Sequence, residues 1–359
     1  MARWRRLTSI AGLAAGAAAA GAGAVIAAQK IAVGRIRLQP DPAAGELFWE
    51  RGGSPITVLA NDGVPLAAEI SGSDDAKVNV ILCHGYALSQ EVWHYQTEAL
   101  AEVARVVTWD QRSHGRSGRS DRDRVSIDQL GADLAAVLAA TVPGDRPVVL
   151  VGHSMGGMTI MALADQHPEL FGTKVIGVVL ISTVASGVDP TGWLPPPLRP
   201  VARVAGPPII AGSGGGRRAV AVDRARRTAS DLAFLSTRYV AFGDNSVSPT
   251  VVDFLERVIR ETPTEVIAQF YPVLLKHDKR DALPVIGRVP TVVLAGAKDR
   301  LVSPRLTAEQ AELIPGAELI TVPGAGHVMI LEQPAIVTEA IIELIGRALA
   351  GAAERRRLA

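Results

Sequence analysis

Short apolar runs that alternate with helical patterns are the feature of this sequence that most limits its fold. Six such runs are too short for helices and rich in branched apolar residues, at 78–85, 105–110, 147–154, 175–182, 291–299 and 317–324. A strand that is apolar throughout is buried on both faces, and amphipathic helical segments lie between most of these runs. The pattern predicts an α/β fold, with a mostly parallel central sheet and helices on both faces.

The chain divides around one long interval that lacks strand patterns. Residues 55–72 predict two further strands around an Asn-Asp-Gly turn. About a hundred residues of helical, Pro-rich and Gly-rich sequence then separate the sixth core strand from the seventh, which is too long for a simple crossover connection. We therefore predict a helical cap, inserted between the two parts of one core domain. The predicted boundaries are a linker at 31–53, core segments at 54–183 and 289–359, and the cap at 184–288.

Composition excludes several classes of function. The formal net charge of +1 gives no general attraction to nucleic acid. The one cysteine, Cys83, allows no internal disulfide and no Cys/His cluster spaced for zinc, and its apolar surroundings predict a small core residue.

The N-terminus has the pattern of an export signal or a membrane anchor. Three arginines occur in the first six residues, and Leu7 to Gln29 carries no charge. A bilayer span needs about 20 apolar residues, so this segment is long enough, although its Ala and Gly content makes it only weakly apolar. We predict a signal or anchor over residues 1–30 and a membrane-anchored or exported protein rather than a cytoplasmic one. The alternative is an Ala-rich helix that packs on the domain.

One serine stands where an apolar run meets a helical pattern. Gly152 and Gly156 flank Ser154 at two positions on either side, which is the G-x-S-x-G pattern of a tight strand-to-helix turn. Such a turn raises the hydroxyl at the carboxyl edge of a sheet and at the start of a helix, where free N–H groups stabilise negative charge. We predict that Ser154 is a nucleophile.

A nucleophilic serine needs a base, and the base needs an orienting acid. His327 lies in a glycine-flanked loop after the last strand pattern, and Asp299 ends the strand pattern before it. The order Ser154, Asp299, His327 is the chain order of a hydrolase with this turn. Asp189, which follows the preceding strand pattern, is the competing candidate for the acid.

Two backbone N–H groups are the expected oxyanion donors. Tyr86 follows the His84-Gly85 turn at the end of a strand pattern, and Met155 follows the nucleophile. His84 itself is expected to stabilise its turn by hydrogen bonding rather than to catalyse, and the ring of Tyr86 is a candidate for the pocket wall.

Five motifs together resemble the α/β-hydrolase superfamily, in its capped branch of lipases, esterases and epoxide hydrolases. They are HGY at 84–86, DQRSHGRSG at 110–118, GHSMGG at 152–157, AGAKD at 295–299 and GAGHVMILEQP at 324–334. The resemblance extends over about residues 54–349 and implies that 110–118 is a structural turn, in which Ser113 replaces the usual glycine. The epoxide hydrolases and dehalogenases of this branch use an aspartate nucleophile, so Ser154 argues against both activities.

The predicted function is a serine hydrolase that cleaves carboxylic esters of lipophilic substrates through an acyl-enzyme. The cap would supply an apolar acyl-binding wall, and neither a metal nor an organic cofactor is implied. The same three residues would also serve a thioesterase, a lactonase, a C–C hydrolase or a cofactor-free perhydrolase. A membrane-tethered binding protein without turnover is the alternative outside the enzymes.

Overall fold

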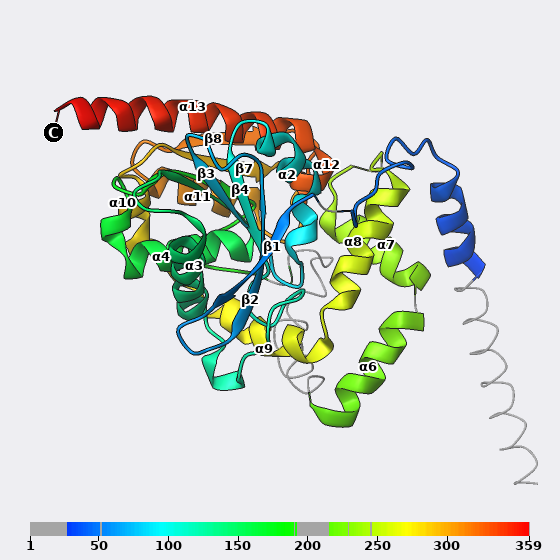
Figure 1. Cartoon of the computed structure of the whole chain (residues 1–359). Coiled ribbons are helices and arrows are strands. Elements are labelled where there is room, and N and C mark those ends of the chain that lie inside the picture. Colours follow the sequence, from blue (N-terminus) through cyan, green and yellow to red (C-terminus); the bar gives the residue numbers. More distant parts are fainter. Residues whose placement is uncertain are drawn as a thin grey trace, which may run out of the picture.

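The computed structural model describes residues 27–50, 52–189, 191, 215–228, 230–244 and 246–358. Eight strands within these ranges form one sheet in the order β1-β2-β4-β3-β5-β6-β7-β8 (Figure 1). The strands are β1 (Ser54–Leu59), β2 (Pro65–Ser71), β3 (Asn79–Cys83), β4 (Arg105–Trp109), β5 (Val148–His153), β6 (Val175–Ile181), β7 (Thr291–Gly296) and β8 (Glu318–Val322). β2 pairs antiparallel with both β1 and β4, and the other five pairings are parallel, so the predicted mostly parallel α/β fold is confirmed.

Helices cover both faces of this sheet because its central strands have no solvent-facing side. Every residue of β3, β4, β5, β6 and β7 is buried. On one face lie α2 (His94–Ala101) and α13 (Pro334–Leu358), and on the other lie α3 (Ile127–Thr141), α4 (Met155–Gln166) and α10 (Leu283–Ile286). The remaining core helices are α11 (Pro304–Leu313), α12 (Met329–Glu332) and the short 3₁₀ turns η1 (Gln90–Trp93), η2 (Arg122–Arg124), η3 (Pro168–Leu170) and η5 (Arg280–Ala282).

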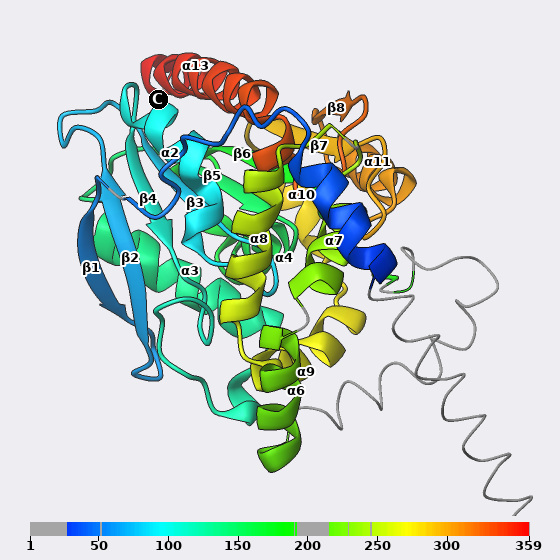
Figure 2. The same cartoon turned by 90° about the vertical axis from the view of Figure 1, so that its right-hand side faces the viewer.

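The described part of the interval between β6 and β7 consists of helices joined by loops. It contains α6 (Gly216–Thr228), α7 (Ser230–Ala241), α8 (Pro249–Glu261) and α9 (Thr264–Leu275), which lie together beside the sheet (Figure 2). The Pro-rich part of the predicted cap, at 189–200, lies almost entirely outside the described residues. After α9 the chain returns to the core earlier than the predicted boundary at residue 288, since Leu283 and Ile286 are buried against the sheet.

The segment before β1, which we predicted to be a linker, packs against the cap. Residues 27–37 are helical and lie beside α7 and α8 (Figure 2). Arg37 donates to Asp253 of α8 at 3.0 Å, and the rings of Phe48 and Phe254 stack with their centroids 4.3 Å apart. At Arg37 and Phe48 this segment therefore packs on cap helix α8.

The predicted signal or anchor at residues 1–30 lies outside the described residues except for its last four positions. Within the described ranges, no helix combines the length and the apolar character needed to cross a membrane.

Candidate active site

Ser154 occupies a strained turn between β5 and α4. Its φ of 54° and ψ of −119° place a non-glycine residue in a conformation that costs about 1–3 kcal/mol. The flanking glycines make this turn possible, because a Cβ atom at Gly156 would lie 2.0 Å from the carbonyl oxygen of Cys83, and one at Gly152 would lie 2.6 Å from the Gly156 carbonyl carbon. The Ser154 N–H donates to the carbonyl of Ile181 at 2.9 Å, which ties the turn to β6.

The structure brings Asp299, and not Asp189, to His327. The Nδ1–H of His327 donates to Oδ2 of Asp299 at 2.8 Å, and both side chains are almost fully buried. The other carboxylate oxygen accepts the backbone N–H groups of Leu301 and Val302, each at 2.8 Å, so the carboxylate cannot rotate freely. Asp189 instead accepts the backbone N–H and the hydroxyl of Thr191.

The loop of His327 is attached to the nucleophile turn by a side chain that the sequence analysis did not select. The Nε2–H of His153, the residue before Ser154, donates to the backbone carbonyl of His327 at 2.9 Å. Burial lowers the pKa of His153 to about 3, so this ring stays neutral. Within the described chain, the Ser154 hydroxyl and the His327 ring are not hydrogen-bonded to each other, and such contacts often form only when substrate binds.

The two predicted oxyanion donors lie on separate elements beside the serine. A Cβ atom at Gly85 would lie 3.2 Å from the Cβ of Ser154, so the loop that leads to Tyr86 runs directly beside Ser154. Neither the Tyr86 nor the Met155 backbone N–H donates to any other described residue. Both N–H groups are therefore available to an oxyanion, as this role requires.

His84 makes the hydrogen bonds expected of a turn-stabilising residue. Its Nδ1–H donates to the carbonyl of Gly85 at 2.8 Å, and its Nε2 accepts the backbone N–H of Gln111 at 2.9 Å. Burial lowers the pKa of His84 to about 4. The ring is neutral, and both of its nitrogens are hydrogen-bonded to backbone groups.

The ring of Tyr86 joins the core to the cap. Its hydroxyl donates to the carbonyl of Ile267 in α9 at 2.5 Å. Burial raises the pKa of this phenol well above its usual range, so the hydroxyl remains a donor. The apolar cluster around it includes Met155 and Met158 of α4 and Val266 and Phe270 of α9. This buried cluster packs cap helix α9 against the start of α4, directly after Ser154.

Residues 110–118 form a buried turn whose contacts are structural. The carboxylate of Asp110 accepts the backbone N–H groups of Gln90 and Arg116. Ser113, where the related motif usually has glycine, adopts a φ of 66°, and its hydroxyl accepts the Ser120 N–H at 3.0 Å.

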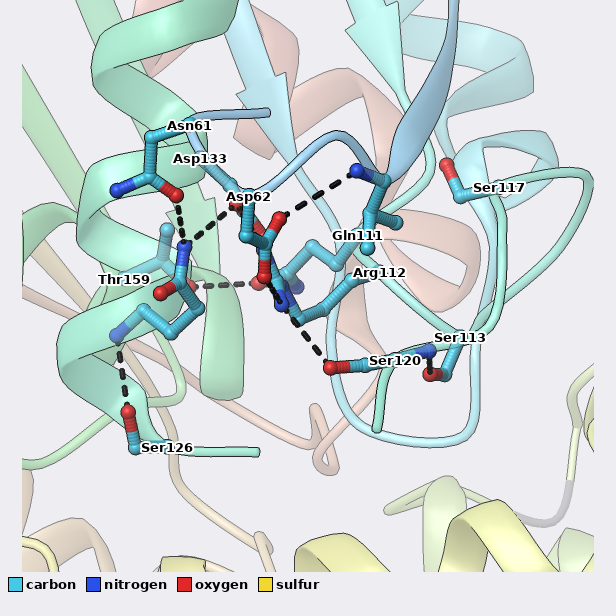
Figure 3. Close-up of polar contacts among 12 residues, drawn as sticks. Asn61, Asp62, Gln111, Arg112, Ser113, Ser117, Ser120, Ser126, Asp133 and Thr159 are labelled. Atoms are coloured by element: carbon cyan, nitrogen blue, oxygen red, sulfur yellow. Dashed lines mark hydrogen bonds and ion pairs between the residues drawn. The ribbon is translucent and has the colours of Figure 1, made fainter. Parts of the chain in front are cut away.

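A buried ion pair starts from the same turn. The guanidinium of Arg112 donates twice to Asp133 of α3, at 2.6 Å each, and also to Asp62 (Figure 3). A signal for this pair was present in the sequence, because Asp133 is an acidic residue on the apolar face of α3 between Leu130 and Val137.

Glu332 is a further residue that the sequence analysis did not select. Its carboxylate accepts the N–H of Gly326, beside His327, at 2.6 Å and the N–H groups of Gly243 and Asp244 at 2.9 and 2.8 Å. It joins the histidine loop to the end of α7 across 89 positions of sequence. No local pattern could have indicated a partner at that separation.

Comparison with known proteins gives a consistent picture. The model of the alpha/beta hydrolase family matches residues 80–340. A pimeloyl-[acyl-carrier protein] methyl ester esterase of Stenotrophomonas maltophilia is 28% identical over 69% of this chain and 85% of its own. The sn-1-specific diacylglycerol lipase ABHD11 of Mus musculus is 28% identical over 79% and 85%. The structure of a thermophilic esterase from Thermogutta terrifontis has a TM-score of 0.65 at 25% identity, with 83% of this chain and 99% of that one covered.

Proposed function

This chain belongs to the alpha/beta hydrolase family, as an enzyme that acts on ester bonds, and from that premise we propose that it hydrolyses carboxylic esters with lipophilic acyl groups. The observation that carries the proposal is the apolar cluster of Met155, Met158, Val266 and Phe270, where cap helix α9 packs on the first turns after Ser154. The relatives named above include a methyl ester esterase and a diacylglycerol lipase, which agrees with an ester of this class.

In the proposed mechanism, Ser154 attacks the ester carbonyl while Nε2 of His327 takes its proton. The N–H groups of Tyr86 and Met155 stabilise the oxyanion, and the imidazolium then protonates the leaving alcohol. Asp299 fixes the ring so that Nδ1 carries the hydrogen and Nε2 faces the reaction. Water, activated by the same histidine, attacks the acyl-enzyme and releases the acid.

A series of p-nitrophenyl esters from acetate to octanoate tests the acyl preference. Each buried methylene contributes about 0.8 kcal/mol, so kcat/KM should rise a few-fold per added CH₂ until the pocket is filled. Phe270→Ala should weaken this rise, whereas Phe254→Ala, a matched change in the outer layer of the cap where Phe48 stacks, should retain it. Flat or falling rates in the wild-type enzyme would show a small acyl pocket instead.

We also propose that the segment at residues 1–30 exports the protein or holds it at a membrane. The basic start and the uncharged run after it support this location. Deleting residues 1–26 leaves the helix at 27–37 and its cap contacts in place, and should move the enzyme into the soluble cytoplasmic fraction. Recovery of full-length protein with Met1 intact from that fraction of the unaltered strain would contradict the proposal.

A further inference from the structure

Gln111 is a buried residue whose side chain hydrogen-bonds both the loop after β3 and helix α4. It follows Asp110 at the end of β4 and is fully inaccessible to solvent. Its backbone N–H donates to the His84 ring, its side-chain Nε2 donates to the His84 carbonyl at 2.5 Å, and its Oε1 accepts the Thr159 hydroxyl at 2.6 Å. Figure 3 shows its side chain beside Thr159, next to the ion pairs of Arg112.

The Nε2 end of the Gln111 side chain bonds the loop that carries the first oxyanion donor, Tyr86. The His84 carbonyl, which accepts from Gln111, is followed in the chain by Gly85 and then by the Tyr86 N–H. Gly85 lies close to Ser154, since a Cβ atom at Gly85 would be 3.2 Å from the Cβ of Ser154, tighter than an ordinary van der Waals contact. A shift of the His84 carbonyl would therefore move the Tyr86 donor relative to the serine.

The Oε1 end of the Gln111 side chain bonds α4, the helix that carries the second donor, Met155. Thr159 lies one turn along α4, and its hydroxyl is also 3.0 Å from the carbonyl of Met155. Met155 is the residue whose own N–H is the second oxyanion donor. The hydroxyl thus couples the Gln111 amide to the first turn of α4.

We propose that Gln111 is a positioning residue that sets the spacing between the Tyr86 and Met155 oxyanion donors. Its side-chain amide links the His84 loop to α4 directly, because Nε2 donates to the His84 carbonyl and Oε1 accepts the Thr159 hydroxyl. An apolar side chain of the same length fills the volume but makes neither bond. The inference rests on the proposed ester hydrolysis, since the donors act on the oxyanion of that reaction.

The test uses Gln111→Met in the full chain, with active sites counted by fluorophosphonate labelling. Removal of a whole oxyanion donor typically costs 10²–10³ in kcat, so displacement of the donors should lower kcat about 10-fold with KM nearly unchanged. The affinity for a trifluoromethyl ketone, which forms a tetrahedral oxyanion on the serine, should fall by a similar factor. Thr159→Val should act in the same direction, and Thr159→Ser, which retains the hydroxyl, should restore the wild-type values.

Gln129→Met is the matched control. The Gln129 amide donates to Asn61 and Asp133 in the neighbouring network and contacts neither donor element. It should change stability without changing kcat per active site. The inference is overturned if Gln111→Met and Thr159→Val keep wild-type kcat and ketone affinity, or if they act through KM alone. A wild-type enzyme without esterase activity would instead contradict the proposed function.

Discussion

Two buried pairs in this protein each join an aspartate to a basic side chain, Arg112 in one pair and His327 in the other, and we expect them to have different roles. Arg112 and Asp133 are joined by two contacts of 2.6 Å, and neither side chain is exposed. His327 and Asp299 are joined by one contact of 2.8 Å, and the histidine retains a small exposed fraction of 8%. Both aspartates hold a basic partner in a fixed orientation, but the two partners differ in their chemistry.

The identity of the base decides the role of each pair. Burial tends to lower the pKa of Arg112, but its hydrogen bonds with Asp133 and Asp62 outweigh burial and raise that pKa above its usual range. A permanently charged guanidinium can connect α3 to the turn after β4 and can do little else. The imidazole of His327 bonds Asp299 through Nδ1 and has a second nitrogen, Nε2, that can take part in proton transfer. The comparison predicts that one pair controls stability and the other controls turnover.

The largest expected effect is that of Asp299→Asn on catalysis. An amide at this position favours the wrong tautomer of the base, so kcat should fall about 10⁴-fold, as for an equivalent change in a serine protease. The free energy of unfolding should change by no more than about 1 kcal/mol, since the amide oxygen can still accept the Leu301 and Val302 N–H groups. Ester hydrolysis and urea unfolding on the same preparation measure both quantities. A variant with near wild-type kcat would show that Asp299 is not the catalytic acid and would favour Asp189 instead.

Asp133→Asn should have the opposite profile. Removing one partner of a buried pair leaves the Arg112 charge poorly compensated, which costs about 3–5 kcal/mol of unfolding free energy. The rate per titrated active site should stay at the wild-type value. If kcat per active site fell while stability did not, the division of roles between the two pairs would be wrong.

Acid destabilisation should give the smallest of the three effects for a single residue. Burial lowers the pKa values of His84, His114 and His153 to about 4, 3 and 3, below the usual 6.5. The unfolded chain therefore binds more protons as pH falls below about 6.5, and each ring should cost about 2 kcal/mol of stability by pH 5.

Unfolding in urea at pH 7.5, 6 and 5 measures this slope. His114→Phe removes one buried ring that carries an unpaired Nε2 and should make the dependence on pH shallower. An unchanged slope in that variant would show that His114 is already protonated or accessible in the folded protein.

The sequence allowed the sheet, the strand order along the chain and the position of Ser154 to be predicted, because these depend on local patterns. It also placed Asp299 and His327 after neighbouring strands, which is sufficient for them to meet at one edge of a parallel sheet. The bridges made by His153, Gln111 and Glu332 were not predictable in this way, since each joins residues that are 27 to 174 positions apart. Apart from the Thr159 hydroxyl, the groups that these three side chains bond are backbone carbonyls and N–H groups, which have no sequence signature. The catalytic assignments of Ser154, Asp299, His327, Tyr86 and Met155 remain predictions for the experiments above.

The close contact between the end of α7 and the histidine loop restricts how the cap can move. A Cβ atom at Gly243 would lie 2.2 Å from the carbonyl oxygen of Gly324, and Glu332 accepts hydrogen bonds from both segments. If the cap opens to admit substrate, the C-terminal end of α7 must therefore stay in place as the hinge while α6 and α9 move. The amide hydrogens of Gly243, Asp244 and Gly326 should then exchange with solvent at one common slow rate, set by opening of the core rather than of the cap.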